Sequence, residues 1–151
     1  MMHFQYSSWF DAPVESLFGF HERPDAIELL TPPGQRLKVV SKCGGLKVGA
    51  LVDLRVGPLG MQWLARHIVY ERDRLFVDEQ VKGPFAHWVH EHRFQAEDGG
   101  SRLTDDIEFA LPLGAAAELA AGWAVKWQLR KMFQHRHKVT GDFLDKHHER
   151  H

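Results

Sequence analysis

The middle of the chain alternates apolar, strand-like segments with short turn sequences, and no helical segment separates them. Neighbouring segments of this kind can pair directly, so they predict an antiparallel rather than a parallel sheet. Turn-forming sequences such as Gly44-Gly45, Gly83-Pro84 and Asp98-Gly99 divide them at hairpin intervals. The strand candidates are residues 36–42, 47–56, 62–71, 75–82, 86–96 and 101–111.

The N-terminal segment predicts one more strand and two short helices. Residues 2–10 can form a strand. Asp11 is the expected N-cap of a first helix, with Pro13 in the first turn, that extends to about His21. Pro24 opens a second short helix.

The C-terminal third changes to a helical period. From Ala115, apolar residues recur at spacings of three and four, which predicts a long helix to about His137 or beyond. Gly141 is expected to end or kink this helix, leaving residues 141–151 as a C-terminal tail. With no internal repeat and no long linker, residues 1–151 are interpreted as one domain of the α+β class. A curved sheet of about seven strands can bury its concave face only by wrapping around another element. The final helix is the element available for this.

Composition and charge exclude several kinds of protein. The 151 residues carry 19 Lys and Arg against 20 Asp and Glu, which argues against a nucleic-acid partner. No apolar run approaches the roughly 18 residues of a membrane span, and the N-terminus lacks a signal-peptide pattern. A cytoplasmic location is therefore predicted. Cys43 is the single cysteine, so no intramolecular disulfide is possible, and with no local base it is expected to be inert.

The Asp98-Gly99 turn sets the register of the last hairpin. A two-residue type I′ turn would pair Glu97 with Gly100. Alternate residues then share one face, which is apolar and therefore buried. The facing pairs on it are Phe94 with Leu103, His92 with Asp105, His90 with Ile107, and Trp88 with Phe109.

This register points His90, His92 and Asp105 into an apolar interior. Directly opposed residues lie close enough for His92 and Asp105 to hydrogen-bond. One interpretation is a structural His–Asp pair inside the core. Another is a group that lines a cavity and orients a ligand oxygen. Metal binding by His-x-His plus Asp is a third interpretation. The sequence lacks the spacing of further residues that would orient these ligands, so we expect no metal and no cofactor.

Two registers remain open for the preceding hairpin. A three-residue loop, Gly83-Pro84-Phe85, would place Gln80 beside Trp88 and Asp78 beside His90 on the inward face. A two-residue loop would instead turn Leu75, Val77 and Glu79 inward.

The final helix carries basic residues close to its aromatic face. Lys126, Arg130 and His137 lie near the same angular face as Trp123 and Phe133. Either their stems lie on apolar surface while the charged heads reach water, or one of them recognises an anion at a pocket mouth. Trp123 and Trp127 fit either core or ligand contacts.

With these motifs the chain resembles the SRPBCC superfamily of START and Bet v 1-like helix-grip proteins, and within it the bacterial polyketide cyclase/dehydrase-like ligand-binding group. The resemblance implies a helix-grip fold with a deep hydrophobic pocket between sheet and long helix. Relatives bind lipids, quinones, polyketides or plant hormones, and a minority catalyse cyclisation, dehydration or hydrolysis. Phe109 stands where relatives often carry Tyr. The residues that carry the resemblance are 10–18, 30–33, Phe76, Asp78, Gln80, Gly83, Pro84, Trp88, His90, His92, Phe94, Asp105, Phe109, Pro112, Phe133 and Arg136.

Three functions follow as hypotheses. The first is binding of a small, largely hydrophobic molecule, such as a lipid, quinone, polyketide or aromatic compound. The second is a cyclase or dehydratase in which His92, oriented by Asp105, acts as general base. The third is a protein-interaction module without an open cavity. The expected ligand-binding residues are Asp78, Gln80, Trp88, His90, His92, Phe94, Asp105, Ile107, Phe109, Trp123, Trp127 and Arg130.

Overall fold

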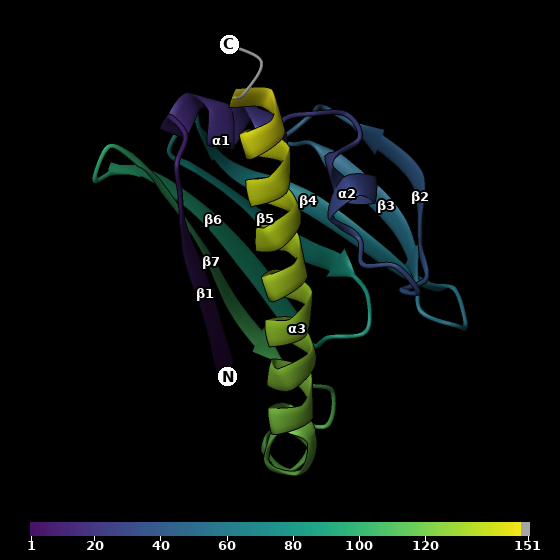
Figure 1. Cartoon of the computed structure of the whole chain (residues 1–151). Coiled ribbons are helices and arrows are strands. Elements are labelled where there is room, and N and C mark those ends of the chain that lie inside the picture. The colour runs from purple at the N-terminus through teal and green to yellow at the C-terminus, as the bar shows by residue number, and fades with distance from the viewer. Residues whose placement is uncertain (149–151) are drawn as a thin grey trace.

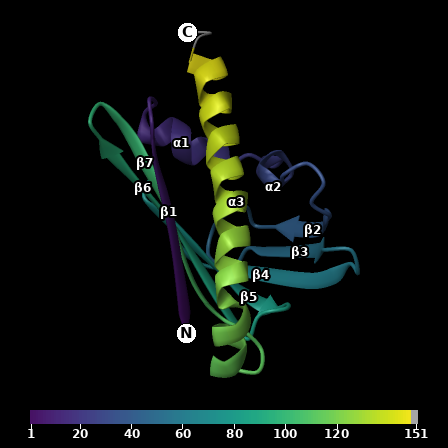
Figure 2. The same cartoon turned by 60° about the horizontal axis from the view of Figure 1, so that its bottom comes forward.

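Seven antiparallel strands form one curved sheet in the order β1-β7-β6-β5-β4-β3-β2. The computed structural model describes residues 1–148. The long helix α3 crosses the concave face, and two short helices lie near one end of it (Figures 1 and 2). The elements are β1 (Met2–Phe10), α1 (Val14–His21), α2 (Ala26–Leu30), β2 (Leu37–Cys43), β3 (Leu51–Val56), β4 (Met61–Glu71), β5 (Leu75–Lys82), β6 (His87–Glu97), β7 (Gly100–Ala110) and α3 (Ala115–His148).

The predicted α+β helix-grip architecture is confirmed, and so is the register of the last hairpin. Glu97 pairs with Gly100, and His92 lies opposite Asp105. Asp98 and Gly99 have φ angles of 50° and 78°, as a two-residue type I′ turn requires. The four predicted facing pairs are all present, and the apolar residues among them are buried.

The hairpin of β5 and β6 adopts the register of the three-residue alternative. Asp78 pairs with His90, and Phe76 pairs with His92. Gln80 belongs to the turn, because its side-chain amide donates to the carbonyl oxygen of Phe85 and accepts from the Phe85 amide. The alternative that turned Glu79 inward does not occur.

Both short helices begin later than the sequence suggested. Pro13, not Asp11, is the N-cap of α1, and no side chain caps the helix. The extended conformation of Pro13 (ψ 150°) delays the first helical residue to Val14. Strand β3 also begins late, because positive φ angles at Gly44, Gly45 and Gly49 keep the chain turning until Ala50.

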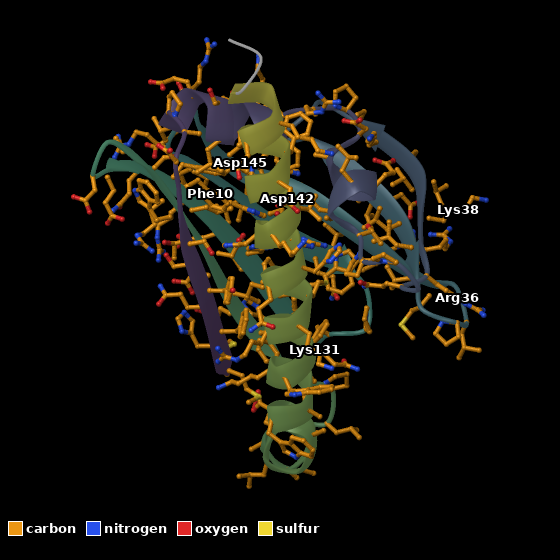
Figure 3. The ribbon with its side chains drawn as sticks, viewed as in Figure 1. Phe10, Arg36, Lys38, Lys131, Asp142 and Asp145 are labelled. Carbon is orange, nitrogen blue, oxygen red and sulfur yellow. The ribbon has the colours of Figure 1, made fainter. Side chains whose placement is uncertain are left out.

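The prediction that Gly141 ends or kinks the last helix is wrong for residues 141–148, which α3 includes. Thr140 and Leu144 are buried on either side of Gly141. Burying a leucine side chain contributes about 1.5–3 kcal/mol, more than the cost of about 1 kcal/mol for a mid-helix glycine. Phe10 lies beside the last turns of α3, which carry Asp142 and Asp145 (Figure 3). The rest of the predicted tail, residues 149–151, lies outside the described residues.

Two apolar clusters fill the space between the sheet and the helices. One joins Phe10, α1, Phe94 and Leu144. The other joins Phe4, Trp88, Ile107 and Phe133. Along β6 and β7 the two clusters are separated by His90, His92 and Asp105, so the polar group lies between two halves of the core. In residues 1–148, no helix has the length and apolar character needed to cross a membrane.

Substitutions at two glycines test the backbone conformation assigned to the turn between β6 and β7. Gly99→Ala should lower the free energy of unfolding by about 1–2 kcal/mol, because an L-residue is strained at its positive φ. Gly19→Ala should raise it by about 0.5–1 kcal/mol, because Gly19 lies within α1 and a β-carbon there meets no atom within 4 Å. Urea denaturation measures both values. Equal effects of the two substitutions would contradict the assigned turn.

Candidate functional site: a pocket floored by histidine and aspartate

A pocket of about 1010 Å³ lies between α3, α2 and strands β2–β6. Its wall is mostly apolar and aromatic, with Trp63, Trp88 and Phe133 among the contributing side chains. Exposed residues of the wall, such as Lys42, Trp127 and Lys131, mark its mouth. The pocket exists because α3 packs along β1 and the short helices and makes few contacts with the strands on the other side of the sheet.

The carboxylate of Asp105 is the centre of a buried polar network. Its Oδ1 accepts a hydrogen bond from Nε2 of His90 at 2.7 Å, and its Oδ2 accepts one from Nε2 of His137 at 2.6 Å. Nδ1 of His137 lies 2.7 Å from the hydroxyl of Ser8. The network thus joins β6, β7, α3 and β1 through side chains that are mostly shielded from water.

His92 lies between two carboxylates. Its Nε2 is 2.8 Å from Oδ2 of Asp78, and its Nδ1 is 3.2 Å from Oδ1 of Asp105. Its ring stacks on that of His90 with a centroid distance of 3.6 Å, and on Phe76 at 3.9 Å. Both nitrogens of His92 are therefore engaged.

The pKa shifts follow from burial and from these contacts. Burial disfavours the charged form of His92, but its interactions with Asp105 and Asp78 outweigh burial and raise its pKa. Burial would raise the pKa of Asp105, but its histidine partners hold it well below the ordinary value. Burial and the neighbouring His92 lower the pKa of His90. Burial would likewise raise the pKa of Asp78, but its hydrogen bond with His92 lowers it. These directions favour two carboxylates, an imidazolium at His92 and a neutral His90.

Nδ1 of His90 is the histidine nitrogen that is available to accept a proton. Its Nε2 donates to Asp105, and no residue among 1–148 hydrogen-bonds its Nδ1, while the side chain lines the pocket. A general base in this site would therefore be His90. The role proposed from sequence for His92 does not suit a ring with both nitrogens engaged.

Arg136 adds a cation with an unpaired donor to the pocket wall. Its Nε is buried and has no hydrogen-bond partner among the described residues. Its guanidinium carbon lies 5.2 Å from the centroid of the Phe133 ring, and burial lowers its pKa. Desolvation likewise lowers the pKa of His21, another wall residue, to about 4. A guanidinium whose Nε is buried and unused is a natural partner for an anionic or carbonyl group.

The residues expected from sequence to contact a ligand occupy several environments. Asp78, Trp88, His90, His92 and Trp127 contribute to the pocket wall. Phe94, Ile107 and Phe109 are core residues, and Asp105 lies behind the histidines. Gln80 holds the turn at Phe85. Trp123 is 71% exposed, and Arg130 is exposed beside the ring of Phe4. Arg130 therefore fits the first of the two interpretations of the basic residues on the final helix: its stem lies on apolar surface and its charged head reaches water.

Sequence reasoning missed His137 as a partner of Asp105. The available signal was its position in the buried stripe of α3, four residues after Phe133. It also missed Ser8, Arg136 and the two wall residues Trp63 and His67 as parts of one site. These residues come from different elements, and no local pattern brings them together.

The network predicts a large stability effect at Asp105. Asp105→Asn keeps the shape but removes the charge that three imidazoles face, so the free energy of unfolding should fall by about 3–5 kcal/mol. Urea denaturation measures this loss. The matched control is Asp106→Asn, on the opposite face of β7 beside Arg93, which should cost less than about 1 kcal/mol. A loss of under about 1 kcal/mol at Asp105 would contradict the network's structural importance.

Solved structures share this fold over nearly the whole chain. Norcoclaurine synthase from Thalictrum flavum, in complex with dopamine and hydroxybenzaldehyde, matches with a TM-score of 0.73 and 11% identity, covering 97% of this chain and 87% of that one. Ara h 8.0201 matches with a TM-score of 0.70 and 15% identity, covering 96% and 98%. At these identities the likeness concerns the fold.

A third structure is more similar in sequence. A nucleoside-diphosphate sugar epimerase from Corynebacterium glutamicum matches with 26% identity and a TM-score of 0.72, over 93% of this chain. The match spans only 29% of the epimerase, so that name describes a much longer protein.

The comparison with curated proteins gave no significant match. The family model described as polyketide cyclase / dehydrase and lipid transport matches residues 10–136, which span the pocket and its histidine–aspartate floor. The chain therefore belongs to the polyketide cyclase/dehydrase and lipid transport family.

Proposed function

We propose that this protein binds a small, largely hydrophobic molecule in the pocket, with the polar end of the molecule directed toward Arg136 and His90. The observation that carries the proposal is an apolar pocket of about 1010 Å³ whose wall includes a buried guanidinium nitrogen with no partner among the described residues. Ligand pockets are commonly apolar cavities of this size with a few placed polar groups. An interaction module with a filled core would have no such space.

The polar groups indicate what the ligand carries. Arg136 is a donor, and neutral His90 offers Nδ1 as an acceptor. A carboxylate, phenol or carbonyl oxygen would use the guanidinium, and a hydroxyl would use the histidine. The molecule in this proposal is therefore amphipathic, with an aromatic or aliphatic body against Trp63, Trp88 and Phe133.

Filling part of the pocket should weaken binding. Ala65 is buried on β4 and contributes to the wall, so Ala65→Phe places a ring in the cavity. The fluorescent probe anilinonaphthalene sulfonate should bind this variant about tenfold more weakly or worse, which corresponds to about 1.4 kcal/mol. Ile68→Phe adds the same ring at an exposed position of the same strand and should leave the affinity unchanged. Equal probe affinity in both variants would place the probe outside this pocket.

The role of Arg136 can be separated from that of the apolar wall with a pair of probes. N-phenylnaphthylamine has the rings of anilinonaphthalene sulfonate without the sulfonate. Arg136→Gln should weaken the sulfonate probe about ten- to hundredfold, because a charged hydrogen bond contributes about 1.5–3 kcal/mol. The neutral probe should be affected little. Arg130→Gln, on the exposed side of α3, is the control. Equal losses for both probes would show that Arg136 supports the pocket without recognising an anion.

A further inference from the structure

Three side chains with metal-binding atoms meet at the floor of the pocket. Asp78 on β5 and His90 and His92 on β6 each offer one ligand atom, and these atoms all lie within 4.8 Å of one another. All three residues contribute to the pocket wall. We propose that Asp78, His90 and His92 bind a divalent first-row transition metal ion that faces the pocket. This proposal replaces the expectation from sequence that the site holds no metal.

The strand register places the three residues together. Asp78 lies directly opposite His90, and His92 follows on the same face of β6 because side chains alternate with period two. The side chains of His90, His92 and Asp78 are only 6%, 11% and 16% exposed. The group is therefore built on paired strands rather than on loops, which keeps its geometry defined.

Asp105 contacts both histidines and orients their rings, an arrangement that the sequence did not reveal. It accepts from Nε2 of His90 at 2.7 Å and lies 3.2 Å from Nδ1 of His92. Each histidine thus has one nitrogen turned to the same carboxylate. The other nitrogen is the one that would bind a metal: Nδ1 of His90, and Nε2 of His92, which now lies 2.8 Å from Asp78. Metal-binding histidines commonly donate their second N–H to a carboxylate in this way, which fixes the ring and its tautomer. In the sequence, Asp105 was considered as the third ligand; the structure gives that position to Asp78.

The remaining part of the network holds Asp105 in place. Oδ2 of Asp105 accepts from His137 at 2.6 Å, and His137 is in turn bound to Ser8. The carboxylate is therefore oriented from α3 and β1 as well as from β6. The rings of His90 and His92 stack with a centroid distance of 3.6 Å and an interplanar angle of 24°, so at least one ring would turn for their in-plane lone pairs to meet at one ion.

The separations suit one ion once this turn brings the ligand atoms, which now lie within 4.8 Å of one another, closer together. Nitrogen and oxygen ligands lie about 2.0–2.2 Å from zinc, so two atoms on one ion are at most about 4.2 Å apart. Nε2 of His92 and Oδ2 of Asp78 are already 2.8 Å apart, and the ion would replace the proton between them. Two imidazoles and one carboxylate form a donor set that suits zinc or iron rather than calcium or magnesium. The open coordination positions would face the pocket.

The test is a titration with metal alone, so its outcome is independent of hydrophobic ligand binding. The chain also has histidines at 147, 148 and 151, and these are replaced by glutamine in the full-length background protein. After chelator treatment, Co²⁺ should bind at one saturable site with visible d–d absorption, and Zn²⁺ should displace it. Asp78→Asn and His90→Gln should each weaken Co²⁺ binding about tenfold or more, by the loss of a ligand.

Two further variants distinguish this site from adventitious binding. Asp105→Asn should weaken Co²⁺ binding about 10–100-fold although it removes no ligand. His87→Gln, on the same strand but paired with Glu108 on the other face, should bind as the background protein does. Circular dichroism confirms that each variant is folded. Absence of a d–d band, or binding unchanged by Asp78→Asn and His90→Gln, would overturn the proposal and leave the group as a hydrogen-bonded network.

Discussion

The arrangement of this protein depends on the hydrogen bonds made by the buried carboxylate of Asp105. An unpaired carboxylate in a protein interior is strongly unfavourable, so it must gather hydrogen-bond donors. Asp105 gathers three histidines, two from the neighbouring strand and one from α3. The apolar clusters on either side of it contribute most of the burial energy, but they are non-directional. Asp105 adds direction, because it sets which turn of α3 lies over which part of the sheet.

The anchoring of α3 at Asp105 also explains why the pocket lies on one side of this helix. The helix is held along β1, β6 and β7, where His137 meets Asp105 and Phe133 packs on Phe4. Strands β2–β5 curve away on the other side (Figures 1 and 2). The inner face of those strands has to be covered by something other than α3. Part of it is covered by α2, and the rest is the wall of the pocket.

The two proposals use the same floor in different ways. Without a metal, Nδ1 of His90 is an acceptor that a ligand hydroxyl can meet. With a metal, that nitrogen would be a ligand of the ion, and an open coordination position would take its place opposite the polar end of the bound molecule. In both cases Arg136 remains available for an anionic group, because its buried Nε has no partner within residues 1–148.

The sequence predicted the class of fold, the antiparallel pairing and the register of β6 with β7. These features follow from local rules: the period of side chains along a strand, and the positive φ angles that Asp98 and Gly99 accept. The same rules were enough to place His90, His92 and Asp105 on the buried face. They could not choose between two loops after Lys82, and so they left open whether Asp78 faced inward. That choice depends on Gln80 closing the turn onto Phe85.

Tertiary structure decided the remaining features, because they depend on contacts between distant parts of the chain. Which carboxylate each histidine binds could not be read from the strand pairing, since His92 reaches Asp78 while His90 takes the shorter bond to Asp105. The helical period of the C-terminal segment did not distinguish His137, which is buried against Ser8, from Trp123, which is exposed. The docking of α3 on the sheet makes that distinction. The sequence therefore determined that His90, His92 and Asp105 are turned inward, and packing determined which groups they meet.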